Sequence, residues 1–255
     1  MPPLLHVYAL PHLVQPEELA GGTVVVIDVL RATTTICHAV AAGVDEVIPC
    51  LEVEEALATA ESLSGKVVLG GERKGVRIDG FDLGNSPGEY TPDRLDGATL
   101  AFTTTNGTRA MHHAHLAPRV LLAAFVNASA VVQALLDEPQ VYILCSGTCD
   151  QYSEDDVLLA GMLVERLERI GGFSYAQNAQ AATAREYLLH SFPLPKAMGA
   201  ESLEPELLVP KLRLSAGGRN LIAVGLEDDL VDAAQIDRFD CVPEYYPATG
   251  RIRPA

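Results

Sequence analysis

The stretch Val24-Val25-Val26-Ile27-Asp28-Val29-Leu30-Arg31-Ala32-Thr33-Thr34-Thr35 decides the fold class of this 255-residue chain. Its first four residues are apolar and β-branched, which favours a strand buried on both faces. A short polar loop and a helix-like run over 35–42 follow. The alternation of such strands and helices along the chain predicts an α/β fold, with a largely parallel or mixed sheet covered by helices.

Two other apolar runs open into polar loops in the same way. Residues 100–102 lead into Thr103-Thr104-Thr105-Asn106-Gly107-Thr108-Arg109, and residues 141–144 lead into Cys145-Ser146-Gly147-Thr148. Ligands of α/β sheets bind outside the carboxyl ends of the strands, and the N–H groups of such loops and of helix starts attract anions. The three loops therefore predict a site for a small anionic ligand, with phosphate as the first candidate.

The charge of the chain limits which partners it can bind. It has 18 Lys and Arg against 34 Asp and Glu, a formal net charge of −16. No basic stripe is available for nucleic acid, so an anion site must supply its own local positive field. No apolar run is long enough to span a membrane, and the first residues do not resemble a signal peptide. The five cysteines are expected to be reduced thiols in a cytoplasmic protein.

The order of the expected elements predicts two parts. Residues 1–172 are expected to form the α/β domain that carries the strand-end loops, and residues 173–255 a mostly helical part, packed on the first as a second lobe. Within the first part, residues 70–90 contain six glycines and are expected to form one long functional loop. That segment holds the densest basic cluster of the chain, Arg73, Lys74 and Arg77. Small α/β enzymes are often dimers, so a homodimer is also expected.

Several familiar phosphate-handling motifs are absent from the sequence. There is no Gly-x-x-x-x-Gly-Lys-Ser/Thr, so nothing supports a P-loop. Leu30 stands two residues after Asp28, where an aspartyl-phosphate enzyme would have a second Asp. Gln151 stands six residues after Cys145, where a thiolate phosphatase would have an Arg. These absences argue against all three enzyme classes.

Two acidic positions each allow two interpretations. Asp28 either caps the loop that follows it or serves as a metal ligand or general base at the mouth of its strand. Ser153 and Asp156 resemble a helix capping box, while Glu154 and Asp155 between them have the hard oxygen ligands that Mg²⁺ favours. Capping and metal binding can coexist, so both interpretations stay open at this stage.

Several stretches of the chain resemble the 2-phosphosulfolactate phosphatases, and the resemblance runs almost from end to end. They are Asp28 to Thr35, Gly71-Glu72-Arg73, Gly80 to Pro87, Thr103 to Thr108, Phe125-Val126-Asn127, Cys145-Ser146-Gly147, Glu154-Asp155 with Ala160-Gly161, and Ser215 to Pro243. The resemblance implies a family-specific α/β topology and a Mg²⁺-dependent phosphatase. Such an enzyme hydrolyses 2-phospho-3-sulfolactate to 3-sulfolactate and phosphate, a step towards coenzyme M.

The resemblance does not fix the substrate of this chain. A phosphatase for a related small phospho-acid and a non-catalytic binder of small phosphorylated acids are the alternatives. A thiol enzyme that uses Cys145 is a third, although no His or Arg is placed to activate this cysteine.

The expected site residues fall into three groups. The expected catalytic residues are Asp28, Arg31, Arg73, Asn106 and Cys145. The expected Mg²⁺ ligands are Asp28, Glu154 and Asp155. The expected substrate-binding residues are Thr33, Thr34, Glu72, Asn85, Ser86, Thr104, Thr105, Gly107, Thr108, Arg109, Asn127, Ser146 and Gly147. Arg31, Arg73 and Arg109 are expected to bind the phosphate or sulfonate bidentately, because a guanidinium matches these groups.

Overall fold

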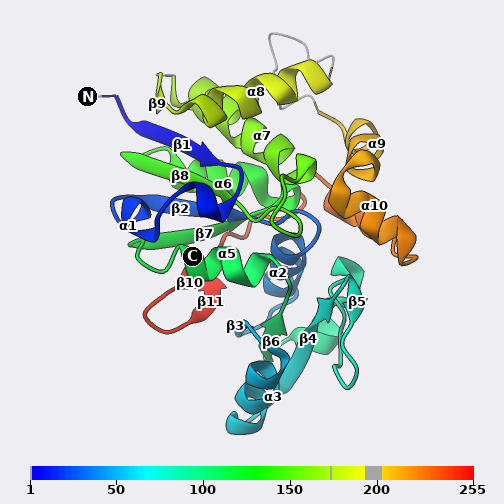
Figure 1. Ribbon diagram of the computed structural model, residues 1–255. Coiled ribbons are helices and arrows are strands. Elements are labelled where there is room, and N and C mark those ends of the chain that lie inside the picture. The colour runs from blue at the N-terminus through cyan, green and yellow to red at the C-terminus, as the bar shows by residue number, and fades with distance from the viewer. Residues whose placement is uncertain (1, 173, 193–202) are drawn as a thin grey trace.

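The computed structural model describes residues 2–172, 174–192 and 203–255, and its strands form one mixed sheet covered by helices (Figure 1). The strand order is β5-β4-β6-β3-β11-β10-β7-β2-β8-β1-β9. The strands are β1 (Leu4–Tyr8), β2 (Thr23–Ile27), β3 (Glu46–Cys50), β4 (Val67–Arg73), β5 (Val76–Arg77), β6 (Thr99–Thr103), β7 (Arg119–Ala123), β8 (Gln140–Cys145), β9 (Ala176–Gln177), β10 (Pro243–Tyr246) and β11 (Arg251–Pro254). The predicted α/β class is confirmed.

Helices connect most of the strands. They are α1 (Pro16–Leu19), α2 (Ala32–Ala41), α3 (Val53–Ser62), α4 (Pro92–Leu95), α5 (Gly107–His113), α6 (Ala128–Leu135), α7 (Glu154–Gly171), α8 (Ala179–Ser191), α9 (Pro205–Leu214), α10 (Ala216–Ala223) and α11 (Asp229–Ala233). Three short 3-10 helices are η1 (Pro11–Leu13), η2 (Pro87–Glu89) and η3 (Phe125–Asn127). None of the helices in the described ranges is long and apolar enough to cross a bilayer.

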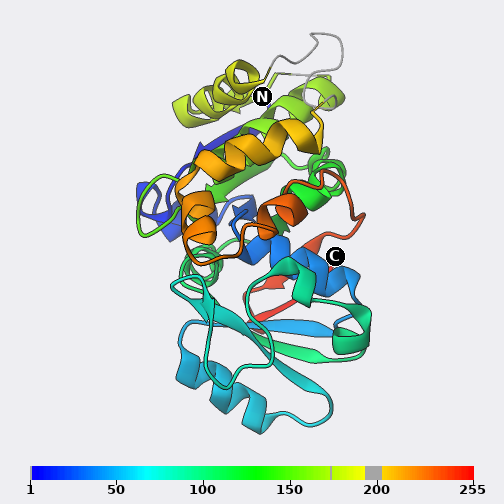
Figure 2. The same cartoon turned by 90° about the vertical axis from the view of Figure 1, so that its right-hand side faces the viewer.

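Two sets of parallel strands make up most of the sheet. One set contains β7, β2, β8 and β1, and the other contains β3, β6 and β4. The C-terminal hairpin of β10 and β11 joins them, because β10 pairs antiparallel with β7 and β11 pairs antiparallel with β3. The two sets consequently run in opposite directions, and they lie in the upper and lower parts of Figures 1 and 2.

Strand β2 lies inside the first set and is buried along its whole length. Val25 and Ile27 pack into the core with α6 and α7, whereas Val24 and Val26 pack with α2 and α5 on the opposite face. Full burial of one such side chain stabilises the fold by about 1.5–3 kcal/mol. Burial on both faces explains why the sequence here is continuously apolar rather than alternating.

The prediction that residues 70–90 form one long loop is wrong in its first part. Strand β4 continues to Arg73, and β5 pairs with it as a hairpin. Gly71 has φ +142, and a Cβ at this position would collide with the Thr103 carbonyl of β6, so this glycine lets β4 and β6 pair. Lys74 and Gly75, both with positive φ, form the turn. The glycines thus serve pairing and turning rather than breaking the strand.

The described part of the tract after residue 172 is mostly helical, but it also supplies β9, β10 and β11. Strand β9 pairs with β1 at one edge, and the β10–β11 hairpin lies in the middle of the sheet. Residues 173 and 193–202 of this tract lie outside the described residues. The division of the chain at residue 172 stays a prediction.

Candidate active site

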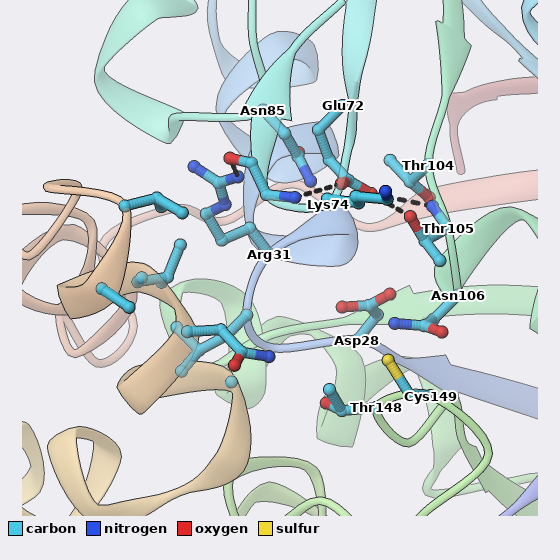
Figure 3. A pocket seen from close by; sticks show the side chains of 17 residues that line it. Asp28, Arg31, Glu72, Lys74, Asn85, Thr104, Thr105, Asn106, Thr148 and Cys149 are labelled. Carbon is cyan, nitrogen blue, oxygen red and sulfur yellow. Dashed lines mark hydrogen bonds between the residues drawn. The ribbon is translucent and has the colours of Figure 1, made fainter.

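A cavity of about 340 Å³ lies where strands from both sets end (Figure 3). Four segments that follow or end β2, β4, β6 and β8 form part of its wall, and α10 with the residue after it forms another part. The lining residues are Asp28, Leu30, Arg31, Glu72, Lys74, Gly75, Asn85, Thr104, Thr105, Asn106, Thr148, Cys149, Gly217, Asn220, Leu221, Ala223 and Val224. The three strand-end loops singled out in the sequence meet here, in a space suited to a small molecule.

Asp28 presents a buried carboxylate to this cavity. Its Oδ1 accepts a hydrogen bond of 3.3 Å from the Ala32 N–H at the start of α2. Helix α5 begins against it at Gly107, where a Cβ would lie 2.7 Å from Oδ2 of Asp28, so the close approach requires glycine. Burial, followed by the negative charge of Asp155, raises the pKa of Asp28 to about 7.

Two more buried carboxylates, Asp155 and Asp156, lie in the first turn of α7. Asp156 accepts from the N–H groups of Val29 at 2.9 Å and Gly147 at 3.0 Å, so it ties together the loops after β2 and β8. Burial raises the pKa of both carboxyl groups, and the charges of Asp155 and Asp28 raise that of Asp156 further. Within the described ranges, neither they nor Asp28 form an ion pair with Lys or Arg.

Arg31 provides a fixed positive charge at the opposite side of the cavity. Its Nη1 donates to Oδ2 of Asp229 at 2.6 Å and to Oγ of Ser86 at 3.2 Å. Its Nη2 donates to the carbonyl of Gly75 at 2.7 Å. The Arg31 side chain is only 2% exposed. Protein groups hold the guanidinium on one side, and its other side lines the cavity.

Glu72 fastens the β4–β5 turn to the loop after β6. Its Oε1 accepts from both the N–H and the Oγ1 of Thr105 at 2.8 Å, and its Oε2 accepts from the Gly75 N–H at 2.7 Å. These bonds place Lys74 over the cavity between Glu72 and Thr105 (Figure 3). Glu72, expected to bind substrate, lines the cavity, but its oxygens are already engaged with the two loops.

A sequence model of the 2-phosphosulpholactate phosphatase family matches residues 8–247. The chain belongs to this family.

Relatives in this family cover nearly the full length. A protein of Symbiobacterium thermophilum, described as a probable 2-phosphosulfolactate phosphatase, is 42% identical over 231 residues, which is 90% of this chain and 93% of that protein. Proteins of Clostridium novyi and Thermotoga maritima carry the same description. The first is 35% identical over 235 residues (91% and 93% of the two chains), and the second is 36% identical over 221 residues (87% and 88%).

Two of the three arginines expected to bind anions in this family member lie elsewhere. Arg73 does not line the cavity, and its Nη2 donates to the Leu51 carbonyl at 3.0 Å and to Oγ1 of Thr103 at 2.9 Å. Arg109 is exposed on α5 and does not line the cavity. Lys74, which the sequence marked only as part of a basic cluster, occupies the position expected for Arg73.

Several predicted threonines bond within the protein instead of facing the cavity. Helix α2 begins at Ala32, earlier than the predicted start at residue 35, so Thr33 and Thr34 lie in its first turn. Their Oγ1 atoms donate to the carbonyls of Asp28 and Val29 at 2.8 and 2.7 Å. These hydroxyl groups shape the loop after β2. In the same way, Oγ1 of Thr108 lies 3.0 Å from Oγ1 of Thr104 at the start of α5.

Cys145 and Asn127 are both buried and do not line the cavity. Burial raises the pKa of the Cys145 thiol well above its usual value, and the nearby Asp156 adds to this effect, so the thiolate is disfavoured. The Asn127 side chain accepts from the Ala124 N–H at 2.8 Å and donates to the carbonyls of Leu122 and Cys241. It secures the start of α6.

The acidic run at the start of α7 does not form the predicted capping box. Ser153 makes no side-chain cap, and its Oγ instead donates to Oδ1 of Asp155 at 2.6 Å. Glu154 is partly exposed and does not line the cavity. Its charge lies near Tyr152 and Tyr187, where it contributes to raising the pKa of both phenols.

The remaining predicted residues form two layers around the ligand space. Asn85, Thr104, Thr105 and Asn106 line the cavity itself. Ser86, Gly107, Ser146 and Gly147 lie just outside, where they contact Arg31, Asp28 or Asp156.

Sequence reasoning missed the contribution of α10, α11 and part of the loop after β8. The missed residues are Cys149, Asp156, Gly217, Asn220, Leu221 and Asp229. The resemblance over residues 215–243 was the one signal that pointed to the last four, but it named no individual position there.

The carboxylates of the site fit a divalent cation in part. Among the described residues, no group of three or more His, Cys, Asp and Glu side chains is arranged to hold a metal ion. Mg²⁺, however, commonly uses one or two carboxylates and completes its shell with water and substrate phosphate. Asp28 lines the cavity and Asp155 lies behind it, outside the lining. The two are buried neighbours, and the negative charge of Asp155 raises the pKa of Asp28.

Proposed function

We propose that this chain hydrolyses 2-phospho-3-sulfolactate to 3-sulfolactate and inorganic phosphate, with Mg²⁺ as cofactor. The family match over residues 8–247 and the descriptions of the relatives support the reaction and the substrate. The observation that carries the proposal is the cavity itself, in which the buried carboxylate of Asp28 and the fixed guanidinium of Arg31 line one small space. That arrangement suits a phosphorylated acid that a cation helps to bind.

The chain's own groups bind and orient the substrate. Arg31 and Lys74 supply positive charge for the phosphate and for an acidic group of the substrate. The amide of Asn106 and the N–H groups at the start of α5 add neutral donors on the same wall. Leu221, Ala223 and Val224 form an apolar wall that limits the access of bulk water to the phosphate.

Asp28 and Asp155 are the residues that would hold Mg²⁺, and Glu154 is not among them. When bound, the ion supplies positive charge for the phosphate oxygens as negative charge develops during hydrolysis. Asp156 keeps the loops after β2 and β8 together, so it sets the position of Asp28 rather than contacting the ligand.

A phosphatase for a related phospho-acid is the second candidate, and one observation favours it. The cavity offers two cationic side chains among its described lining residues, whereas phosphosulfolactate carries three acidic groups. Leu30, Leu221 and Val224 line the rest with apolar surface. A substrate with an uncharged third substituent would fit this wall as well as a sulfonate does.

Phosphate release tests the proposal. The purified protein is incubated with racemic phosphosulfolactate, phospholactate or phosphoglycerate, with Mg²⁺ or with EDTA. Mg²⁺-dependent release that is fastest from phosphosulfolactate is the expected result. Equal release from all three would support the related phospho-acid instead. No release, together with a ligand-dependent rise in Tm, would indicate a non-catalytic binder.

The cytoplasmic location, the role on the way to coenzyme M and the homodimer are further proposals. Light scattering of the purified protein tests the homodimer, which requires twice the 27.2 kDa mass of the chain.

A further inference from the structure

We infer that Asp229 is a positioning residue of the cavity, which orients the Arg31 guanidinium so that two of its N–H groups face the substrate. The inference rests on the proposed function, because its kinetic readout is phosphate release. Asp229 comes from α11, 198 residues further along the chain than Arg31. It lies in the stretch 215–243 that carried the family resemblance, but it was not among the individual residues expected to bind substrate, bind metal or catalyse.

Three protein acceptors hold one side of the guanidinium. Oδ2 of Asp229 accepts from Nη1 at 2.6 Å, and the pair is almost fully buried, with side chains 2% and 7% exposed. Oγ of Ser86 also accepts from Nη1 and in turn donates to Oδ2 of Asp229 at 3.0 Å. Together with the Gly75 carbonyl on Nη2, these contacts fix the plane of the group as well as its position.

The remaining donors of Arg31 are available to the cavity. A guanidinium has five N–H donors, and the three hydrogen bonds to protein leave one on Nε and one on Nη2. No acceptor for these two occurs among the residues that the structure describes. Arg31 lines the cavity, so a ligand bound there lies on the side of the guanidinium that the three acceptors do not occupy. Two donors side by side match two oxygens of a phosphate, carboxylate or sulfonate.

The partners of Arg31 come from three separate segments. Gly75 belongs to the β4–β5 turn, Ser86 precedes η2, and Asp229 begins α11, which packs against η2. The charge of Asp229 is what makes this contact strong, because a buried hydrogen bond between two ions is worth more than a neutral one. Removal of that charge should free the guanidinium to rotate without unfolding the segments that surround it.

Asp229 has two effects on an anionic substrate, and they oppose each other. Its negative charge weakens the positive field of Arg31, so the variant Asp229→Asn should bind an anion at least as tightly as the wild type. Its hydrogen bond orients the two N–H groups of the Arg31 guanidinium that face the substrate, so Asp229→Asn should have a lower kcat. A positioning role therefore predicts a lower kcat with an unchanged or lower KM.

The experiment compares Asp229→Asn, Asp229→Glu and Ser86→Ala in the full chain, with phosphosulfolactate and Mg²⁺. We expect kcat to fall about 10–100-fold in Asp229→Asn and less in Ser86→Ala, with partial recovery in Asp229→Glu. The matched control is Asp232→Asn, one turn along the same helix, because Asp232 pairs with Arg238 at 3.7 Å and does not line the cavity. It should retain wild-type kinetics.

A double-mutant cycle separates positioning from a merely structural role. If Asp229 acts through Arg31, Asp229→Asn should change kcat less than 3-fold in an Arg31→Lys background, because a lysine has no fork to orient. Equal losses of kcat in both backgrounds would overturn the inference, as would an unchanged kcat in Asp229→Asn. If Asp229→Asn does not fold, the same cycle is run with Ser86→Ala, because Ser86 bonds to both Asp229 and Arg31. Equal losses of kcat in the wild-type and Arg31→Lys backgrounds would then overturn the inference.

A binding measurement keeps this inference separate from the proposed reaction. Inorganic phosphate is titrated calorimetrically into the wild type, Asp229→Asn and Arg31→Lys. If the wild type releases no phosphate from any substrate but binds phosphate through Arg31, the proposed function fails while the Asp229 inference is still tested. In that case, a binding enthalpy for phosphate that is identical in Asp229→Asn and wild type would overturn the inference.

Discussion

Neutral donors hold the carboxylates on one side of the cavity, whereas a carboxylate holds the arginine on the other. On the acidic side, Asp28, Asp155 and Asp156 accept hydrogen bonds from backbone N–H and serine hydroxyl groups. On the basic side, Arg31 is paired with Asp229 at 2.6 Å. Within the described ranges, no Lys or Arg pairs with the carboxyl groups of the acidic side, whereas Arg31 on the basic side is already paired with a carboxylate.

This difference shows which half of the site depends on its ligand. The basic side is ordered by protein contacts, because Asp229, Ser86 and the Gly75 carbonyl together hold the Arg31 guanidinium. Ionisation of all three buried carboxyl groups without a cation costs free energy. Burial and mutual repulsion therefore raise the pKa values of the three groups. A bound divalent cation would stabilise the acidic side and would change the basic side little.

The largest expected effect follows from neutralising the acidic side. Asp28→Asn should lower kcat/KM by about 10³-fold, because it removes a metal-binding carboxylate from the cavity. Phosphate release at saturating Mg²⁺ measures the loss. Asp150→Asn is the matched control, because Asp150 is exposed in the loop after β8 and outside the cavity lining. Near-wild-type turnover of Asp28→Asn would remove Asp28 from the proposed mechanism.

The stability of the metal-free protein should depend on pH through the same residue. Asp28 ionises near pH 3.8 in the unfolded chain but only near 7 in the folded protein. Between these values the unfolded state loses a proton that the folded state keeps, so the free energy of unfolding should fall as the pH rises from about 4 to 7. The titration of Asp28 should lower the free energy of unfolding by about 4 kcal/mol over this pH range.

Urea unfolding in EDTA at several pH values measures this dependence, and the difference between wild type and Asp28→Asn isolates the contribution of Asp28. Between about pH 4 and pH 7, Asp28→Asn should lose less stability than the wild type does. At pH 7, addition of Mg²⁺ should raise the free energy of unfolding of the wild type, and it should raise that of Asp28→Asn by a smaller amount. A wild type whose stability rises across the window relative to the variant would show that Asp28 is ionised in the folded state.

On the basic side, Arg31→Lys should lower kcat/KM by about 10–100-fold. The positive charge stays, but a lysine cannot donate two parallel N–H groups to the substrate and also bond to Gly75, Ser86 and Asp229. The Mg²⁺ dependence of its Tm should match that of the wild type, because the acidic side is untouched. A variant that loses its Mg²⁺ response would show that the two sides are not independent.

The smallest effect is expected for Cys145, which lies outside the cavity lining although the sequence made it a catalytic candidate. Cys145→Ala should change kcat less than 3-fold and should cost about 1 kcal/mol of stability through lost packing. Steady-state kinetics of the folded variant measures this. Abolished activity with normal Mg²⁺ dependence of Tm would instead support a thiol enzyme.

The sequence predicted the α/β class and the meeting of three strand-end loops because both depend on local patterns. Continuous apolar runs such as 24–27 mark buried strands, and polar residues directly after them must lie at a sheet edge. The same local information misplaced the start of α2, since Thr33 and Thr34 read equally well as loop donors or as first-turn residues. It also treated the glycines of residues 70–75 as a loop signal, although they permit close strand pairing.

The sequence by itself determined that this chain forms a helix-covered sheet with polar loops at its strand ends, because hydrophobic periodicity and loop chemistry are properties of neighbouring residues. Only the tertiary structure decided which charged groups face that site. Lys74 rather than Arg73 reaches the cavity because of the hairpin turn, and Asp229 meets Arg31 across 198 residues of sequence. Contacts of that kind depend on how the two strand sets and α11 pack, which no local pattern contains.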